Sequence, residues 1–104
     1  MLYIMYELVE IGPSPKPEKK LAATFVDVET ERRKTVHFGA ANMSDFTLHK
    51  DPERKKRYIA RHSKNEDWND PITAGALSRW ILWNKTTLQA SIRDYKRRFA
   101  GVLR

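Results

Sequence analysis

The sequence predicts an α+β protein in which a small antiparallel sheet of about three strands is followed by about three helices. Apolar residues alternate with polar ones in the first 40 residues, which is typical of half-buried strands. After residue 50 they recur at spacings of three and four, as on one face of a helix. A chain of 104 residues has the size of one domain, so we expect a single domain over residues 1–104.

Residues 1–20 predict a strand followed by a Pro-rich arm. Tyr, Ile, Leu and Val dominate the stretch from Leu2 to Ile11, and apolar residues there recur at every second position. The next segment, "GPSPKPEKK", contains three prolines in nine residues. Its prolines and its solvated charge favour an extended, polyproline-like connector rather than a tight hairpin.

Residues 21–50 predict a hairpin and a polar loop. The segment "LAATFVDV" is typical of a strand that places Leu21, Ala23 and Phe25 on one face. A further strand is predicted at Lys34–Phe38, "KTVHF", and the short polar segment "ETERR" between the two favours antiparallel pairing. The polar residues that follow link the sheet to the helices.

Residues 51–104 form the predicted basic helical half. Asp51 is a favourable N-cap and Pro52 suits the first helical position, so a helix should extend from here to about Lys64. Thr73 is the expected cap of a second helix through "AGALSRWILWN".

The third predicted helix begins after Thr86 or Thr87. Its apolar stripe consists of Leu88, Ile92, Tyr95 and Phe99. Aromatic residues among basic ones can stack on nucleic-acid bases. Because these two aromatic residues share a stripe with aliphatic ones, we expect them to pack in the core instead.

Positive charge is concentrated in the helical half. The formal net charge is +7, and residues 53–104 carry +8 while residues 1–52 carry −1. Such asymmetry favours a surface for phosphates or for an acidic protein, because helix faces that are merely solvated usually mix both signs. We expect an exposed basic face that consists of Arg54, Lys55, Lys56, Lys96, Arg97 and Arg98.

A polar structural hub is expected between the sheet and the first helix. Short polar side chains commonly bind the local backbone and would fasten the end of the sheet to the helix. Within that helix we expect Arg57 and Arg61 to point inward and pair with acidic residues. The expected hub consists of His37, Ser44, Asp45, Thr47, His49, Asp51, Arg57, Arg61 and His62.

No pattern of catalysis or metal binding stands out. The three histidines, His37, His49 and His62, lack the close spacing of zinc-binding pairs such as H-x-x-x-H. A site completed by Asp45 or Asp51 is the alternative. A nucleophile elbow and a phosphate-binding glycine loop are also absent from the sequence. We therefore expect structural histidines, no metal, no cofactor and no enzymatic activity.

Sequence features also bear on location. The chain has no cysteine, which excludes disulfides and thiolate zinc sites and favours an intracellular or intravirion setting. The first ten residues lack the basic start and cleavage site of a signal peptide, so secretion is not expected. No apolar run approaches the roughly 20 residues of a membrane span.

The segment from "VHFGAANMSDFTLHKDPERKKRYIARHSKNEDW" through "TAGALSRWILWNKTTLQASI" resembles a family of small, uncharacterised proteins of giant viruses, the large double-stranded DNA viruses of eukaryotes. The resemblance covers about residues 34–99. Its motif is long: His-Phe-Gly, Ser-Asp-Phe-Thr, His-Lys-Asp, Arg-His, Ser-Arg-Trp and Leu-Trp-Asn-Lys. It brings no reaction or catalytic residue, and residues 1–30 carry nothing of it, which suggests an arm particular to this protein.

The resemblance implies a viral protein, located in the virion or the infected-cell cytoplasm. We expect a non-enzymatic structural protein, a minor capsid or capsid-associated component whose basic helical face binds an acidic partner among other virion proteins. The alternative is a non-specific nucleic-acid-binding protein. A metal-dependent nuclease is the third hypothesis, with Asp45, Asp51 and Glu53 as the candidate carboxylates.

Overall fold

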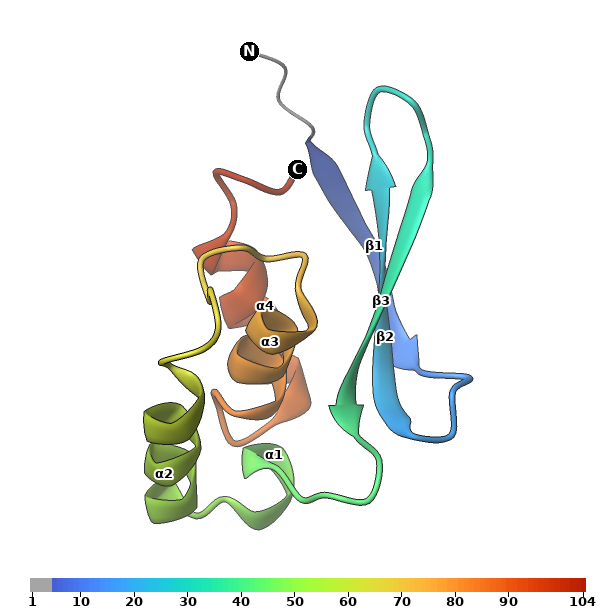
Figure 1. Cartoon of the computed structure of the whole chain (residues 1–104). Helices are drawn as coiled ribbons and strands as arrows, with labels where there is room; N and C mark the ends of the chain where they lie inside the picture. Colours follow the sequence, from blue (N-terminus) through green and yellow to red (C-terminus); the bar gives the residue numbers. More distant parts are fainter. Residues whose placement is uncertain (1–4) are drawn as a thin grey trace.

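The computed structural model describes residues 5–104 and has the predicted α+β architecture, with the strands first and the helices second (Figure 1). The strands are β1 (Tyr6–Pro13), β2 (Lys19–Asp27) and β3 (Arg33–Ala40). They form one antiparallel sheet in the order β1-β2-β3, so each strand pairs with its neighbour in sequence. Residues 2–4 of the N-terminal strand that we predicted lie outside the described residues.

The Pro-rich segment closes a hairpin between β1 and β2, so the prediction of an extended arm was wrong. The connection is only residues 14–18, and Ser14 N donates to Lys20 O at 3.2 Å. Pro15 and Pro17 lie in this loop, where no ladder hydrogen bond is needed. Pro13 ends an edge strand, a position that tolerates a residue without an N–H.

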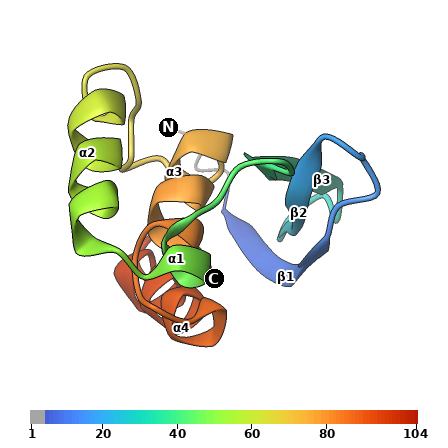
Figure 2. The ribbon, with the colours of Figure 1, turned by 90° about the horizontal axis from the view of Figure 1, so that it is seen from below.

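One face of the sheet carries the core. Ala23, Phe25 and Phe38 are fully buried there, which confirms the face predicted for the second strand. All the helices lie on this side of the sheet (Figure 2). The buried core cluster consists of Ala23, Phe25, Phe38, Leu77, Ile81, Leu82, Tyr95, Phe99 and Leu103.

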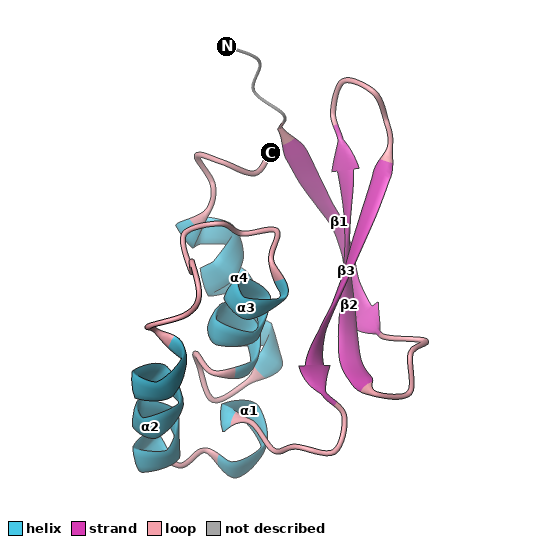
Figure 3. Ribbon diagram, viewed as in Figure 1, coloured by secondary structure: helices cyan, strands magenta, loops and turns pink. Residues whose placement is uncertain are grey.

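Four α-helical segments follow the sheet (Figure 3). They are α1 (Phe46–His49), α2 (Pro52–His62), α3 (Ala74–Leu77) and α4 (Leu88–Arg98). The short α1 lies in the segment that we predicted as a loop. The predicted caps are confirmed, because the side chains of Asp51, Thr73 and Thr87 accept hydrogen bonds from the backbone N–H of Glu53, Ala76 and Ala90.

A π-helical turn, η1 (Ser78–Leu82), continues α3 without interruption. Trp83 N donates to Ser78 O at 3.0 Å, a bond across five residues that widens the turn. The periodicity predicted one regular helix here. The wider turn places Trp83 at the end of the segment, beside α2.

Gly39 allows β3 to approach η1 closely. Its φ is +81°, and a Cβ at this position would lie 2.6 Å from Leu82 Cδ1. A larger residue would therefore be strained in its backbone and would also clash with the core. This glycine is the reason that β3 can end directly against the helices.

The chain ends meet at β1. Leu103 forms a parallel bridge with Tyr6, and Arg104 N donates to Tyr6 O at 2.9 Å. In Figure 1 the C-terminal segment returns to the start of β1. Within residues 5–104, no helix is both long enough and apolar enough to cross a bilayer.

Candidate binding face on helix α2

Helix α2 packs against the protein along a narrow seam. The residues turned inward are Lys55, Tyr58, Ile59 and His62, at spacings of three, four and seven. Tyr58 is the buried member, with 6% of its surface exposed. The other three are half-buried. The opposite side of the helix faces solvent.

Arg57 and Arg61 are exposed, so the prediction that they point inward was wrong. The sequence of α2 offers two alternative inward faces, and both include Tyr58. One face continues through Arg57 and Arg61, and the other continues through Ile59. The protein buries the second face, which leaves the guanidinium groups in water and avoids the desolvation of unpaired charge.

Arg54, Arg57 and Arg61 form a row on the solvent side of α2, which we call the basic row. Their spacing of three and seven residues aligns them along about 10 Å of the helix at 1.5 Å per residue. Lys56 is also exposed on this helix. Within residues 5–104, none of these four side chains has an ion-pair partner. The row is therefore a strip of uncompensated positive charge.

Lys55 does not belong to the exposed face, contrary to our prediction. Its Nζ donates to the carbonyl oxygen of Asn84 at 2.7 Å and lies 4.8 Å from the ring centroid of Phe46. Burial lowers the pKa of this lysine. Lys55 thus braces α2 against the end of η1, while its neighbours Arg54 and Lys56 are exposed as predicted.

The basic residues at the end of α4 are exposed as predicted, but two of them are paired. Arg97 and Arg98 contact the carboxylate of Asp94 at 2.5 Å and 3.3 Å. Lys96 is exposed without such a partner among the described residues. Burial opposes ionisation of Asp94, but the hydrogen bonds from Asn84, Arg97 and Arg98 outweigh it and lower its pKa to about 2.

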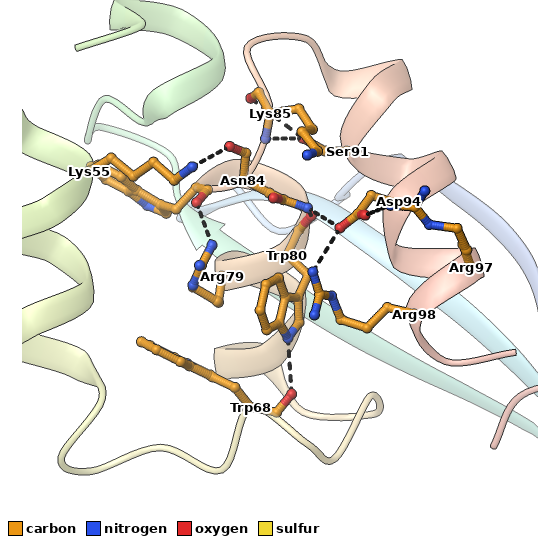
Figure 4. A network of polar contacts seen from close by, with 11 residues as sticks. Lys55, Trp68, Arg79, Trp80, Asn84, Lys85, Ser91, Asp94, Arg97 and Arg98 are labelled. Atoms are coloured by element: carbon orange, nitrogen blue, oxygen red, sulfur yellow. Dashed lines mark hydrogen bonds and ion pairs between the residues drawn. The ribbon is translucent and has the colours of Figure 1, made fainter. Parts of the chain in front are cut away.

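Asn84 and Asp94 form the centre of a polar network that fixes the helices to one another (Figure 4). Asn84 Nδ2 donates to Trp80 O at 3.0 Å and to Asp94 Oδ2 at 2.6 Å. Lys85 N donates to Ser91 Oγ at 2.9 Å. Together with the bond from Lys55, these contacts link α2, η1 and α4.

Arg79 completes this network with aromatic contacts. Its Nη1 donates to Trp83 O at 2.7 Å, and its guanidinium lies 4.2 Å from the ring centroid of Trp80. The ring of Trp68 is half-buried, and its centroid lies 5.4 Å from the same guanidinium. Our sequence reasoning missed Arg79, Asn84 and Asp94. The one available signal was an aspartate three and four residues before two arginines.

An aromatic stack holds α2 to η1. The ring centroids of His62 and Tyr58 are 4.2 Å apart, and those of Tyr58 and Trp83 are also 4.2 Å apart. The ring of His49 also contacts Trp83, in a tilted arrangement with the centroids 5.3 Å apart. These rings fix which side of α2 faces solvent, and so they fix the orientation of the basic row.

Asp45 fastens the sheet to the helices as predicted for the hub. Its Oδ1 accepts a hydrogen bond from Thr47 N at 2.9 Å, which caps α1, and also one from the Thr47 hydroxyl. Its Oδ2 forms an ion pair with Lys20 Nζ on β2. Ser44 is half-buried beside it, and its hydroxyl makes no hydrogen bond with the residues that the structure describes.

His49 and Asp51 join α1 to α2. Asp51 N donates to His49 Nδ1 at 2.9 Å, and the Asp51 side chain caps α2 by accepting from Glu53 N at 3.0 Å. Burial and the positive charge of Arg54 lower the pKa of His49. The neutral imidazole suits this geometry, because only an unprotonated Nδ1 accepts a hydrogen bond.

The remaining histidines lie elsewhere, so the predicted hub is not one cluster. His37 Nδ1 is 2.8 Å from Ser14 Oγ, where it links β3 to the first hairpin. His62 Nδ1 is 3.1 Å from Glu66 Oε2. Over residues 5–104, no three His, Asp or Glu side chains come together in a way that would hold a metal ion.

Fold and surface together define a small α+β protein with a row of exposed arginines on one helix. A family described as "Family of unknown function (DUF5754)" matches residues 9–62, more than half of the chain, and the protein belongs to this family. The match includes the Pro-rich hairpin, so the inference that residues 1–30 are particular to this protein was wrong. No curated protein and no solved structure matches the chain.

Proposed function

We propose that this protein is a non-enzymatic viral structural protein, a minor capsid or capsid-associated component that binds an acidic partner through the basic row of α2. The observation that carries this proposal is the row itself. Three arginines are exposed at aligned positions without an acidic partner among the described residues. Guanidinium groups bind carboxylates and phosphates in bidentate geometry, so such a row suits an acidic surface.

Comparison with α4 explains the choice of α2. Arg97 and Arg98 share the carboxylate of Asp94, and the Arg98 guanidinium lies 3.6 Å from the ring centroid of Trp80. Their charge is already engaged in the fold. Within residues 5–104, the arginines of the basic row make no such contact, so their charge can meet a partner.

The viral context rests on the resemblance of residues 34–99 to proteins of large double-stranded DNA viruses. Capsids of such viruses need many small proteins that join or line the shell. Partners on this proposal are other virion proteins, and the location is the virion or the infected-cell cytoplasm.

Binding to nucleic acid is the second candidate, because the same arginine row also suits phosphates. Binding to nucleic acid and binding to an acidic protein differ in their response to salt. Phosphate contacts release counterions, so the affinity falls steeply with salt, with a log–log slope of about −0.9 for each phosphate neutralised on duplex DNA. An interface with a protein surface should weaken far less.

The decisive experiment is mass spectrometry of purified virus particles, with copy number, for the natural chain and for a triple variant, Arg54→Gln, Arg57→Gln and Arg61→Gln. The variant should fold normally and fall at least tenfold in incorporation. The matched control neutralises exposed positions outside the row, Arg93→Gln, Lys96→Gln and Lys85→Gln, and should incorporate normally. Equal incorporation of both variants would rule out the row. Treatment of opened particles with nuclease distinguishes the two candidate functions. A chain bound to a capsid protein stays with the shell, whereas a chain bound to nucleic acid is released.

A further inference from the structure

A cavity of about 290 Å³ lies directly beside the basic row. It opens between the ends of β2 and β3 and the helices α2 and α3, around the connection from β3 to α1. Its apolar wall is formed by Met43, Tyr58, Leu82 and Trp83. Ala74 and Gly75, at the start of α3, complete this wall with small residues.

The charged residues of this cavity are arranged unequally. Asp45 forms an ion pair with Lys20 within the cavity, whereas Glu66 Oε2 lies 3.1 Å from His62 Nδ1. Two more cations, Lys19 and Arg61, line the cavity without an acidic partner among the described residues. The cavity therefore combines an apolar wall with a net positive rim.

Arg61 belongs to both features. It is the last residue of the basic row, and it also lines the cavity. A chain segment that lies along the row therefore reaches the cavity at Arg61. Met43 lines the same cavity and is 63% exposed, although it is a large apolar side chain.

We propose that the cavity receives one large apolar side chain, such as Phe or Leu, from the acidic polypeptide segment that the basic row binds. This inference rests on the proposed function and adds the identity of the recognised segment. A volume of 290 Å³ is at the lower end of the range of ligand pockets, roughly 300–1,000 Å³, so one side chain suits it better than a larger ligand.

A polypeptide suits the cavity better than a nucleic-acid base does. A base edge must be matched by hydrogen-bonding groups. In the cavity, the Asp45 carboxylate is already engaged by Thr47 and Lys20. A neutral apolar side chain needs no such match, and its acidic neighbours would lie outside the cavity, at Lys19 and Arg61.

The test uses the full chain and two synthetic 13-residue peptides that alternate Asp and Glu and differ only at the centre, which is Phe in one and Gly in the other. Fluorescence anisotropy gives the dissociation constants. We expect the Phe peptide to bind about tenfold more tightly or better, as burial of a large apolar side chain allows. If the natural chain binds the Phe peptide and the Gly peptide with equal affinity, the inference is overturned, but the proposed function is not affected.

Two variants locate the effect. Ala74→Leu places a larger side chain at an exposed position on the cavity wall and should abolish the preference for Phe, while binding of the Gly peptide stays unchanged. Ala100→Leu is the matched control, because Ala100 is exposed and lies outside the cavity. Met43→Ser, at a largely exposed side chain, should reduce the preference without affecting folding. Retention of the full preference in both cavity variants would place the Phe elsewhere and refute the inference.

Failure of the proposed function gives a different result. If Arg54→Gln with Arg57→Gln leaves the binding of both peptides unchanged, the basic row is not the binding face and the proposed function is wrong. A single-stranded thymidine 12-mer serves as the third probe. If its binding falls in Ala74→Leu while the two peptides do not differ, the cavity takes a base, and the peptide inference is overturned.

Discussion

The rings of Tyr58 and Trp83 lie parallel, with their centroids 4.2 Å apart and their planes inclined by only 4°. This contact joins a helix that is otherwise mostly polar to the core beneath it. Ile59, the other apolar residue of the seam, is half-buried. Together with the brace from Lys55, this aromatic pair therefore sets the orientation of the basic row.

Replacement of Tyr58 by Ala should lower the free energy of unfolding by about 3–5 kcal/mol, the usual cost of removing a buried aromatic ring. Tyr58→Phe is the matched control, because it keeps the stacked ring, and it should change stability by less than about 1.5 kcal/mol. Urea unfolding measures both. If Tyr58→Ala is as mild as the control, α2 is held by other contacts.

Lys55 and Lys56 are neighbours with opposite environments, and they provide a sharp comparison. Lys55→Met leaves the Asn84 carbonyl without its donor and should destabilise the protein by about 1–3 kcal/mol. Lys56→Met, at an exposed position, should stay within about 0.5 kcal/mol of the natural chain. Thermal unfolding in one buffer compares them. Equal melting temperatures would mean that Lys55 is not a brace.

The lowered pKa of Asp94 predicts a dependence of stability on pH. This pKa is about 2 in the folded protein, against an ordinary value of 3.8. The ionised carboxylate therefore stabilises the fold above about pH 4, and this contribution is lost as the pH falls toward 2. Asp94→Asn should lower the free energy of unfolding by about 2 kcal/mol at pH 7, and by progressively less as the pH falls below 4. Glu18→Gln, at an exposed carboxylate, is the control. If the difference in the free energy of unfolding between the natural chain and Asp94→Asn does not change with pH, the ionised carboxylate does not stabilise the fold.

Asp45→Ala should lower the free energy of unfolding by about 1–3 kcal/mol, because it removes the cap of α1 and the partner of Lys20. Ser44→Ala changes the adjacent residue, whose hydroxyl makes no hydrogen bond with the described residues, and should be nearly neutral. Chemical denaturation of both variants measures these changes in the free energy of unfolding. An unchanged midpoint for Asp45→Ala would show that the sheet and α1 are joined in another way.

Removal of metal is expected to have no effect on stability. The Nδ1 atom of each histidine lies near a group of the protein, Ser14 Oγ for His37, Asp51 N for His49 and Glu66 Oε2 for His62, and the described residues hold no cluster that could bind a metal ion. Dialysis against a chelator should therefore leave the melting temperature unchanged, and elemental analysis should find no stoichiometric zinc. Stoichiometric metal would require the histidines to rearrange and would bring the nuclease hypothesis forward.

The order of strands and helices could be predicted from the sequence because its signals are local. Alternation fixes the inward face of β2, and Asp51, Thr73 and Thr87 satisfy the first N–H groups of their helices. The Pro-rich hairpin could not be predicted in the same way. Proline composition describes the loop, whereas the pairing of β1 with β2 is a contact between separate segments.

The rotation of α2 was the error that mattered most for the site. Tyr58 lies on both alternative inward faces, and only the position of Trp83 decides between them. Trp83 in turn reaches this position through the π-helical turn, for which the sequence gives no periodic signal. Exposure of Arg57 and Arg61 therefore follows from tertiary packing. In contrast, the exposure of Arg54 and Lys56 was predicted correctly.

The pairing of Tyr6 with Leu103 has a consequence for synthesis of the chain. The three strands join through adjacent hairpins and need only short loop closures, so the sheet should form early. The free edge of β1, however, is met at Tyr6 by Leu103 and Arg104, which leave the ribosome long after the three strands. Until then this edge offers unpaired backbone groups to other chains. Aggregation during expression should therefore begin at β1, and a truncation that removes residues 103 and 104 should increase it.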